Sequence, residues 1–271
     1  MHRKKILVIG DAMLDEYWSG SVSKISPVAP VPVVSMVNAE TRPGAAANVA
    51  ANIEAMGVSV ERIFGCGERI RKITVSVGVQ HIARLDFDYP QKPIVPDSNF
   101  IEAVDRCDMV VALDYGKGSL ANIQELIQAS KGKPFLIDPK GHDYARYRGA
   151  MLLKPNREEM RELVGGWSTR QEQDFKVRQF LHTSGIESIL LTQEADGMTL
   201  YNPEPLHLDS ENKSPVDVSG AGEAVISAFA VALAKGCSQN ESVRFASRAA
   251  GLAIAKPGTA VLTEEQVFGT D

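Results

Sequence analysis

The sequence predicts an α/β fold in which a doubly wound, mainly parallel sheet carries helices on both faces, with a small β flap beside it. Three observations support this prediction. Short apolar runs alternate with segments of helical periodicity, the runs have no polar side, and one segment of alternating polar and apolar residues interrupts the rhythm. The chain has 271 residues, 44% of them hydrophobic, which is enough for one large domain with a core. We therefore expect a single domain over residues 1–271.

The strands of the main sheet are predicted where short runs of apolar residues occur, because a strand covered by helices on both faces has no side in water. In chain order they are KILVIG (5–10), PVVSMV (32–37), SVERIF (59–64), MVVALD (109–114), PFLID (134–138), AMLLK (150–154) and SILLT (188–192), followed by a short β pair near 198–209.

Helices are predicted between these strands, where apolar residues recur at spacings of three and four and where Gly57, Gly132 and Gly236 provide stops. The expected helices lie at 44–57, about 98–107, 120–132, 157–164, 171–183, 221–235 and 240–256.

The segment KITVSVGVQHIARLDF (72–87) is predicted to be a hairpin, because its first arm alternates polar and apolar residues. It falls outside the strand–helix alternation. We therefore expect a β flap at about 72–88 that lies over the strand ends.

Composition and charge exclude several classes of protein. The net charge of −5 argues against a nucleic-acid binder, which normally has a basic face. No apolar stretch has the length of a membrane span, and the five-residue apolar run of MHRKKILVIGD suits a first strand better than a signal peptide. Cys66, Cys107 and Cys237 form no CxxC pair, as expected of reduced thiols. We expect a cytoplasmic protein with no nucleic-acid or membrane partner.

The stretch SPVDVSGAGEAV (214–225) has the features of a phosphate-binding loop that opens a helix. Gly220, Ala221 and Gly222 precede a strongly helical segment, so their backbone N–H groups lie at a helix N-terminus, where an anion is favoured. Two acids, Asp217 and Glu223, bracket the loop. Negative charge beside an anion site suits a group that holds a metal ion or takes a proton from an attacking hydroxyl.

The same stretch resembles the C-terminal signature of the ribokinase/PfkB sugar kinases, usually Asp-x-Thr/Ser-Gly-Ala-Gly-Asp. RPGAAANVAANIEAMG (42–57) is similar to that family's N-terminal signature. Further stretches look like the branch of the family that phosphorylates a heptose 7-phosphate, and together they cover nearly the whole chain. These stretches are GDAMLDEYWSGSVSKISPVAPVPVV (10–34), ARLDFD (83–88), LDYGKG (113–118), DPKGHDYARYRGAMLLKPNREE (138–159) and PGTAVLT (257–263).

This resemblance implies a ribokinase-like kinase that uses ATP and Mg²⁺ and phosphorylates a heptose 7-phosphate or related phosphosugar at its anomeric hydroxyl. It implies catalytic roles for Glu223 as the base and for Gly220, Ala221 and Gly222 as the anion hole. The residues it assigns to the sugar or its phosphate are Asp11, Asp15, Gly44, Asn48, Arg84, Asp86 and Lys140. Those it assigns to the nucleotide are Asn156, Glu159, Thr192, Gly197 and Asp217, with Asn156 and Glu159 also organising Mg²⁺ through water and phosphates. Each residue taken alone also fits a structural role; their number and order favour the kinase.

Four departures from the family pattern leave two hypotheses open. Glu223 replaces the usual Asp, Ala45 replaces the second glycine of the N-terminal signature, Lys154 stands where a small or hydroxyl residue is usual, and the sugar-side segment near 64–72 is shortened. The first hypothesis is a working sugar kinase, and the second is a catalytically degenerate relative that binds a ligand or an assembly partner. Glu223→Asp is expected to raise turnover if only base placement is at fault, and to lower it if the site has re-adapted.

Partners follow from the same resemblance. The flap of this family commonly forms a dimer contact, and Ile73, Val75, Val77, Val79 and Ile82 supply apolar residues to cover, so we expect a homodimer. Members of this branch often carry a fused nucleotidyltransferase domain. Since this chain ends near Asp271, we expect a separate nucleotidyltransferase to act downstream.

Overall fold

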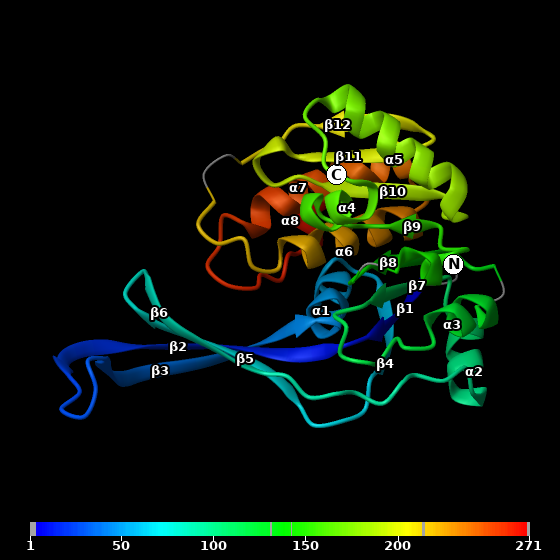
Figure 1. Cartoon of the computed structure of the whole chain (residues 1–271). Helices are drawn as coiled ribbons and strands as arrows, with labels where there is room; N and C mark the ends of the chain where they lie inside the picture. The colour runs from blue at the N-terminus through cyan, green and yellow to red at the C-terminus, as the bar shows by residue number, and fades with distance from the viewer. Residues whose placement is uncertain (1–3, 131, 142, 213–214, 270–271) are drawn as a thin grey trace.

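The computed structural model describes residues 4–130, 132–141, 143–212 and 215–269. An eight-stranded sheet forms the centre of the molecule (Figure 1). Its strands, in spatial order, are β12 (Glu204–Leu208), β11 (Met198–Asn202), β10 (Ser188–Thr192), β9 (Leu152–Leu153), β8 (Phe135–Asp138), β7 (Met109–Leu113), β1 (Lys5–Gly10) and β4 (Ser59–Phe64). The strands from β10 to β4 run parallel, and β11 and β12 are antiparallel. The predicted α/β class with a mainly parallel sheet is confirmed.

Helices cover both faces of this sheet, and each face has its own apolar core. One face packs against α1 (Ala46–Ala55), α6 (Ala221–Ala234), α7 (Gln239–Ala253) and α8 (Glu264–Phe268). The other face packs against α2 (Ser98–Arg106), α3 (Ile123–Ala129), η1 (Tyr144–Tyr147), α4 (Arg157–Val164) and α5 (Arg170–Ser184). A further turn, η2 (Glu194–Asp196), precedes β11. Helix α6 is buried along almost its whole length, and Glu223 is the charged residue among its buried positions. None of the helices in the described part of the chain is long and apolar enough to cross a bilayer.

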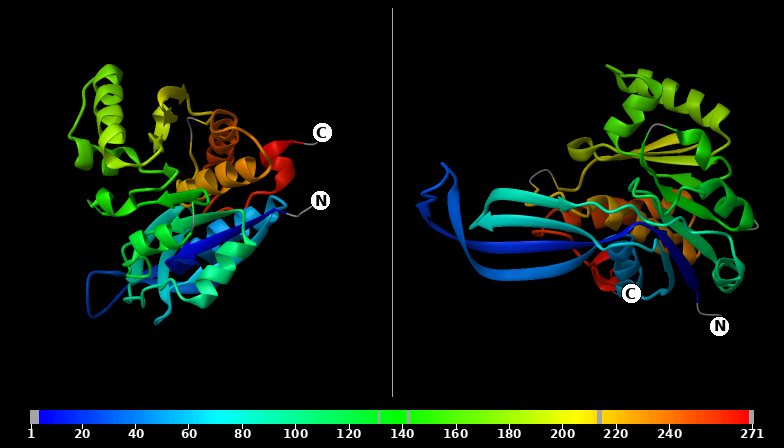
Figure 2. Two further views of the ribbon diagram at one scale, coloured as in Figure 1. Left: turned by 90° about the vertical axis from the view of Figure 1, so that its right-hand side faces the viewer. Right: turned by 60° about the horizontal axis from the view of Figure 1, so that its bottom comes forward.

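A second, four-stranded sheet projects from the body (Figure 2). Its order is β3 (Pro32–Ala45), β2 (Ala12–Ile25), β5 (Ile70–Val77) and β6 (Gln80–Phe87). The predicted flap is therefore the β5–β6 half of a larger sheet. The prediction of a buried strand at 32–37 is wrong, because these residues lie in β3, where most side chains are exposed. No strand was expected at 12–25, because this stretch contains a glycine and scattered charges instead of a short apolar run.

The connection between the two sheets on this side is short. Strand β4 ends at Phe64 and β5 begins at Ile70, so residues 65–69 alone join them. The backbone of Cys66 in this connection forms an isolated antiparallel β-bridge with that of Lys92. The connection agrees with the expected passage of the chain from one strand almost directly to the flap; its effect on the sugar-side wall stays a prediction.

Candidate active site

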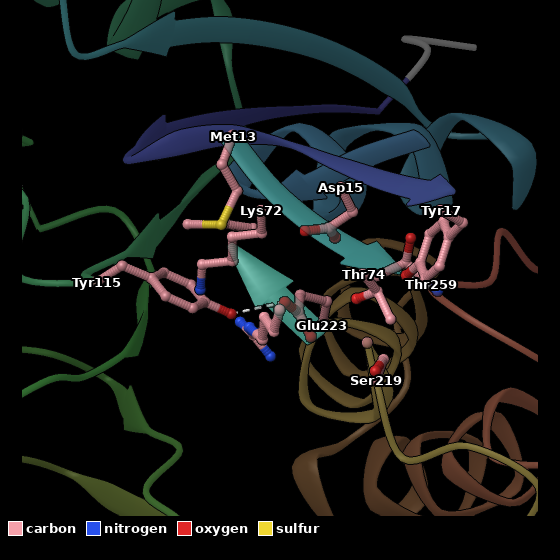
Figure 3. Close-up of a pocket in the computed structure, with 12 residues that line it drawn as sticks. Met13, Asp15, Tyr17, Lys72, Thr74, Tyr115, Ser219, Glu223 and Thr259 are labelled. Carbon is pink, nitrogen blue, oxygen red and sulfur yellow. Dashed lines mark hydrogen bonds between the residues drawn. The ribbon is translucent and has the colours of Figure 1, made fainter. Parts of the chain in front are cut away.

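A cavity of about 170 Å³ lies between the four-stranded sheet and the N-terminus of α6 (Figure 3). We call it the first cavity. Its walls come from segments far apart in the sequence: β2, β5 and β6, the loop after β7, the start of α6 and the segment before α8. The lining residues are Met13, Asp15, Tyr17, Ala45, Lys72, Thr74, Arg84, Tyr115, Ser219, Gly220, Glu223 and Thr259.

The sheet side of this cavity is built by strand register. Asp15 of β2 lies opposite Lys72 of β5, and Tyr17 lies opposite Thr74, which in turn lies opposite Arg84 of β6. Side chains two residues apart on a strand share a face, so these rows point into one space. They place two cations, Lys72 and Arg84, beside one carboxylate, as a site for a charged ligand requires.

The carboxylate of Asp15 is held in an unfavourable environment. Burial and the nearby charge of Glu223 raise the pKa of Asp15 to about 6, against the opposite effect of Lys72 and Arg84. Gly44 on the neighbouring β3 makes room for this carboxylate, because a Cβ at position 44 would lie 2.6 Å from Asp15 Oδ2. Gly44 therefore supports Asp15 and does not itself line the cavity. Carboxylates perturbed by burial and a like charge in a cleft are typical of functional sites.

Glu223, in the first turn of α6, is 9% exposed and is engaged on one side by Tyr115. The Tyr115 hydroxyl donates a hydrogen bond of 2.6 Å to Glu223 Oε1 (Figure 3). Burial and the negative charges of Glu223 and Asp138 hold the pKa of Tyr115 well above its usual value, so this hydroxyl stays protonated and remains a donor.

Two buried polar groups beside the loop before α6 have no hydrogen-bond partner in the part of the chain that the structure describes. Gly220 caps the helix with φ of 75°, and a Cβ there would lie 3.3 Å from Asn48 Nδ2 and 3.2 Å from Thr259. Asn48 Nδ2 and Thr259 Oγ1 are both buried, and neither has a hydrogen-bond partner among the described residues. Because buried polar groups are normally paired, these two atoms mark places where a ligand can bind.

Asp217 stabilises the loop before α6 through backbone hydrogen bonds, and it does not line the first cavity. Its oxygens accept hydrogen bonds from the backbone N–H groups of Ser219 (2.9 Å) and Gly258 (2.8 Å). Although burial acts in the opposite direction, these bonds hold the pKa of Asp217 below its usual value. Thr259 N–H in turn donates to the Tyr17 hydroxyl at 2.9 Å. The loop is thus joined to the four-stranded sheet through residues 258–259.

A buried ion pair lies next to the same loop. Lys154 Nζ is 3.0 Å from Asp138 Oδ1, and the Lys154 side chain is 5% exposed. A Cβ at Gly222 would lie 3.2 Å from Lys154 Nζ. Burial, together with the charge of Glu223, raises the pKa of Asp138 to about 6 against the effect of Lys154. Strand β8 ends at Asp138, and Lys154 directly follows the adjacent parallel strand β9, so both side chains lie beside the start of α6.

Asp11 does not line the first cavity, contrary to prediction. It is fully buried, and its carboxylate accepts hydrogen bonds from the backbone N–H groups of Tyr115 (3.0 Å), Lys117 (3.0 Å) and Ser119 (3.2 Å). A buried carboxylate held by several N–H groups shapes the loop that donates them. Asp11 therefore positions Tyr115 from behind.

A second cavity, of about 420 Å³, lies on the other side of the α6 N-terminus. Its lining is Thr192, Glu194, Ala195, Gly197, Met198, Ser210, Asn212, Pro215, Val218, Ala221, Gly222, Val225, Ser247, Ala250, Gly251 and Ile254. The predicted residues Thr192 and Gly197 lie here. Gly197 has φ of 80°, and a Cβ there would meet Leu208 O at 2.0 Å, so the turn requires glycine.

Four further predicted residues lie outside both cavities. Asn156 caps α4, forming a reciprocal pair of hydrogen bonds with Glu159. Lys140 Nζ is 3.1 Å from Glu159 Oε1, so Lys140 lies beside the predicted metal residues, away from the first cavity. Asp86 likewise does not line the first cavity: it accepts a 2.8 Å hydrogen bond from Arg84 Nε and orients that cation.

The described residues contain no cluster of three or more His, Cys, Asp or Glu side chains that suits a metal ion. Mg²⁺ in phosphate-transfer sites keeps several waters and takes one or two carboxylates together with substrate phosphates. The Glu159 carboxylate fits that donor set.

Several lining residues were not identified from the sequence: Met13, Tyr17, Ala45, Lys72, Thr74, Tyr115, Ser219 and Thr259. Tyr115 and Thr259 occur in stretches that carry the family resemblance, LDYGKG and PGTAVLT. Lys72 and Thr74 are two apart on a predicted strand. Alternation along that strand could have placed them on one face, but not over the start of α6.

Residues 108–266 match the family of pfkB family carbohydrate kinases. Over 300 residues the chain is 38% identical to the D-beta-D-heptose 7-phosphate kinase of Bordetella bronchiseptica, with 98% of this chain and 96% of that protein covered. It is 39% identical over 302 residues to the bifunctional protein HldE of Shewanella sediminis, with 98% of this chain covered. The chain spans 63% of the length of that bifunctional relative.

Solved structures with the same fold include Arabidopsis thaliana ribokinase complexed with ribose and ATP, with a TM-score of 0.76 and 19% identity, covering 99% of this chain and 98% of that one. Phosphofructokinase-2 from Escherichia coli has a TM-score of 0.75 at 17% identity, covering 99% and 97%. These likenesses show that the ribokinase-like fold predicted from the sequence is correct.

Proposed function

We propose, since the chain belongs to the pfkB family of carbohydrate kinases, that it transfers the terminal phosphate of ATP to the anomeric hydroxyl of a heptose 7-phosphate. One observation carries this proposal: the first turn of α6 lines both cavities. Gly220 and Glu223 face the first cavity, and Ala221 and Gly222 face the second. A sugar in the first cavity and a nucleotide in the second would meet across backbone N–H groups at a helix N-terminus, where a transferring phosphoryl group is stabilised.

Glu223 is placed to take the proton of the attacking hydroxyl. Glu223 lines the first cavity and belongs to the same first turn of α6 toward which the phosphoryl group would move. Asn48 Nδ2, which has no protein partner among the described residues, can donate to a sugar oxygen beside Gly220. General-base catalysis of this kind contributes about 10²–10⁴-fold.

The second cavity suits ATP because it is large, mostly apolar in its lining, and ends at the helix N-terminus. Asn156 and Glu159 would hold Mg²⁺ through water and the nucleotide phosphates. The ion, when bound, supplies neutralisation of charge on the phosphates. Within the chain, Lys140 holds one Glu159 oxygen, and the Asn156 side chain fixes the start of α4.

Lys72 and Arg84 supply the positive charge that a substrate phosphate requires. Both line the first cavity, where they lie on the strands opposite the α6 turn. We expect Lys72→Met to raise the KM for heptose 7-phosphate about 10–10²-fold, because a charged hydrogen bond to phosphate contributes about 1.5–3 kcal/mol. The KM for ATP should change little. Steady-state kinetics with each substrate varied in turn measures this.

The matched control is Lys92→Met, which removes an exposed lysine that lines neither cavity. The phosphate contact is assigned wrongly if Lys72→Met leaves the KM for heptose 7-phosphate within twofold of the unmodified protein. Equal use of heptose and heptose 7-phosphate by the unmodified protein would count against a phosphosugar substrate.

A homodimer through the four-stranded sheet is also proposed, on residues that differ in part from those expected, since Val79 is exposed but two others are not. Ile73 and Val75 are buried within the chain and cannot be covered by a partner. Exposed apolar side chains instead gather on β2, β3 and the loop between them, namely Val22, Ile25, Val28, Val31, Met36 and Val37. An exposed apolar strand edge of this kind favours association.

The charge-introducing substitution Val37→Lys tests the dimer. Val37 is 80% exposed, so the change should not disturb the fold. By light scattering at micromolar concentration, we expect the unmodified chain to have twice the mass of a monomer and the variant to be shifted toward monomer. A monomeric unmodified chain would refute the proposal. The cytoplasmic location stays a prediction from the sequence.

A further inference from the structure

We propose that Tyr115 is a positioning residue that adapts this active site to a glutamate at position 223. By holding one carboxylate oxygen, Tyr115 leaves the other oxygen free for the hydroxyl of the sugar. The inference rests on the proposed function, in which Glu223 takes the proton. It also decides between the two expected outcomes of Glu223→Asp, in favour of a site that has re-adapted to the longer side chain.

The contact is short and enclosed. The Tyr115 hydroxyl lies 2.6 Å from Glu223 Oε1, and Glu223 is almost fully buried in the first turn of α6. Figure 3 shows the two side chains meeting at one edge of the first cavity, from opposite walls. A hydrogen bond to a charged acceptor is stronger than one between neutral groups. It fixes a side chain that has one more rotatable bond than aspartate.

Tyr115 is itself held in place, so it acts as a fixed donor. Its backbone N–H donates to the buried carboxylate of Asp11 at 3.0 Å. Its ring packs against the small core formed by Met13, Ala45 and Ile70. The ammonium of Lys72 lies 5.6 Å from the ring centroid. Because these three contacts hold Tyr115 in place, its hydroxyl cannot move to follow a shorter carboxylate at position 223.

An aspartate at position 223 would be one methylene shorter and would leave this fixed hydroxyl without its acceptor. A misplacement of about 1 Å in a catalytic group can cost about 10²-fold in rate. We therefore expect Glu223→Asp to lower kcat, although aspartate is the usual residue at this position in the family that the sequence resembles. Tyr115→Phe should lower kcat as well, because the glutamate then samples orientations away from the sugar hydroxyl.

Titratable groups from several elements surround Glu223. They are Asp15 on β2, Lys72 on β5, Tyr115 after β7, Asp138 at the end of β8 and Lys154 after β9. Tyr115→Phe leaves the four others in place. A loss of kcat in Tyr115→Phe therefore reports the lost hydrogen bond to Glu223, because the charges around the carboxylate are unchanged.

The experiment compares the unmodified protein, Tyr115→Phe, Glu223→Asp and the double variant, with ATP, Mg²⁺ and heptose 7-phosphate as substrates. We expect each single variant to lose about tenfold or more in kcat, with the KM for ATP nearly unchanged. The double variant should be no slower than Glu223→Asp alone, because the two substitutions remove the same contact. Tyr144→Phe is the matched control, since it removes a buried tyrosine hydroxyl that has no partner among the described residues and lies in the other core.

Three results would overturn the inference while leaving the kinase standing. They are a Glu223→Asp variant as fast as the unmodified protein or faster, a Tyr115→Phe variant with unchanged kcat, and an equal loss from Glu223→Asp in both backgrounds. If no protein transfers phosphate, the proposed function fails instead. Thermal unfolding of the four proteins then decides the contact by itself: shifts in Tm that do not add support it, and additive shifts refute it.

Discussion

Glu223→Gln is expected to lower kcat for phosphate transfer by about 10²–10⁴-fold, the range that a positioned general base contributes. Glutamine has nearly the size of glutamate, and its carbonyl oxygen can still accept the hydrogen bond from Tyr115. The substitution therefore removes the base with little change in packing. Turnover is measured as formation of ADP that depends on heptose 7-phosphate.

Nucleotide binding separates this effect from a general loss of structure. The second cavity takes its part of the α6 turn from Ala221 and Gly222, so ADP should raise the Tm of Glu223→Gln as it raises that of the unmodified protein. Glu265→Gln, an exposed residue of α8, is the matched control. A kcat within threefold of the unmodified value would show that Glu223 is not the base.

Lys154→Met is expected to lower the free energy of unfolding by about 3–5 kcal/mol, because it leaves the charge of Asp138 buried without its partner. Both side chains are almost enclosed, at 5% and 14% exposed, and their charged atoms are 3.0 Å apart. Adding Asp138→Asn should restore most of the loss, since a neutral amide costs much less to bury than a lone carboxylate. Urea unfolding of the single and double variants measures both effects.

The control for this series is Lys176→Met, which breaks a more exposed pair with Glu172 within helix α5. Surface pairs of this kind contribute about 0–1 kcal/mol. The account of the buried pair is wrong if Lys154→Met lowers the free energy of unfolding no more than this control does. It is also wrong if the double variant is less stable than Lys154→Met alone.

The parallel sheet could be predicted from the sequence because its strands are buried on both faces and consist of short apolar runs. The four-stranded sheet could not be predicted in full, because its strands are partly exposed. In β2, for example, Asp15, Glu16 and Tyr17 are consecutive, and no run of apolar residues marks a strand. Most side chains of this strand are half-buried or exposed, and the binary pattern on which such predictions depend is lost.

Two parts of the candidate site could be predicted from the sequence. At Gly220–Gly222 a family motif lies at a helix N-terminus, and Asn48 is a motif residue whose side chain lies beside Gly220. Roles that depend on the path of the chain were not. Asp11 follows strand β1 as a ligand-binding carboxylate often does, yet three backbone N–H groups of the loop at 115–119 turn it inward. Tyr115 and Glu223 are 108 residues apart in the sequence, and only the packing of α6 against the sheet makes them neighbours.

The most direct test of the central claim is phosphorus NMR of a reaction containing the protein, ATP, Mg²⁺ and heptose 7-phosphate. A kinase of the proposed specificity produces ADP and a sugar bisphosphate in equal amounts, and the new phosphorus signal couples to the anomeric proton. The original phosphate of the sugar should remain in place. Unchanged ATP and heptose 7-phosphate after prolonged incubation at high protein concentration, or a new phosphate on any other carbon, would contradict the account.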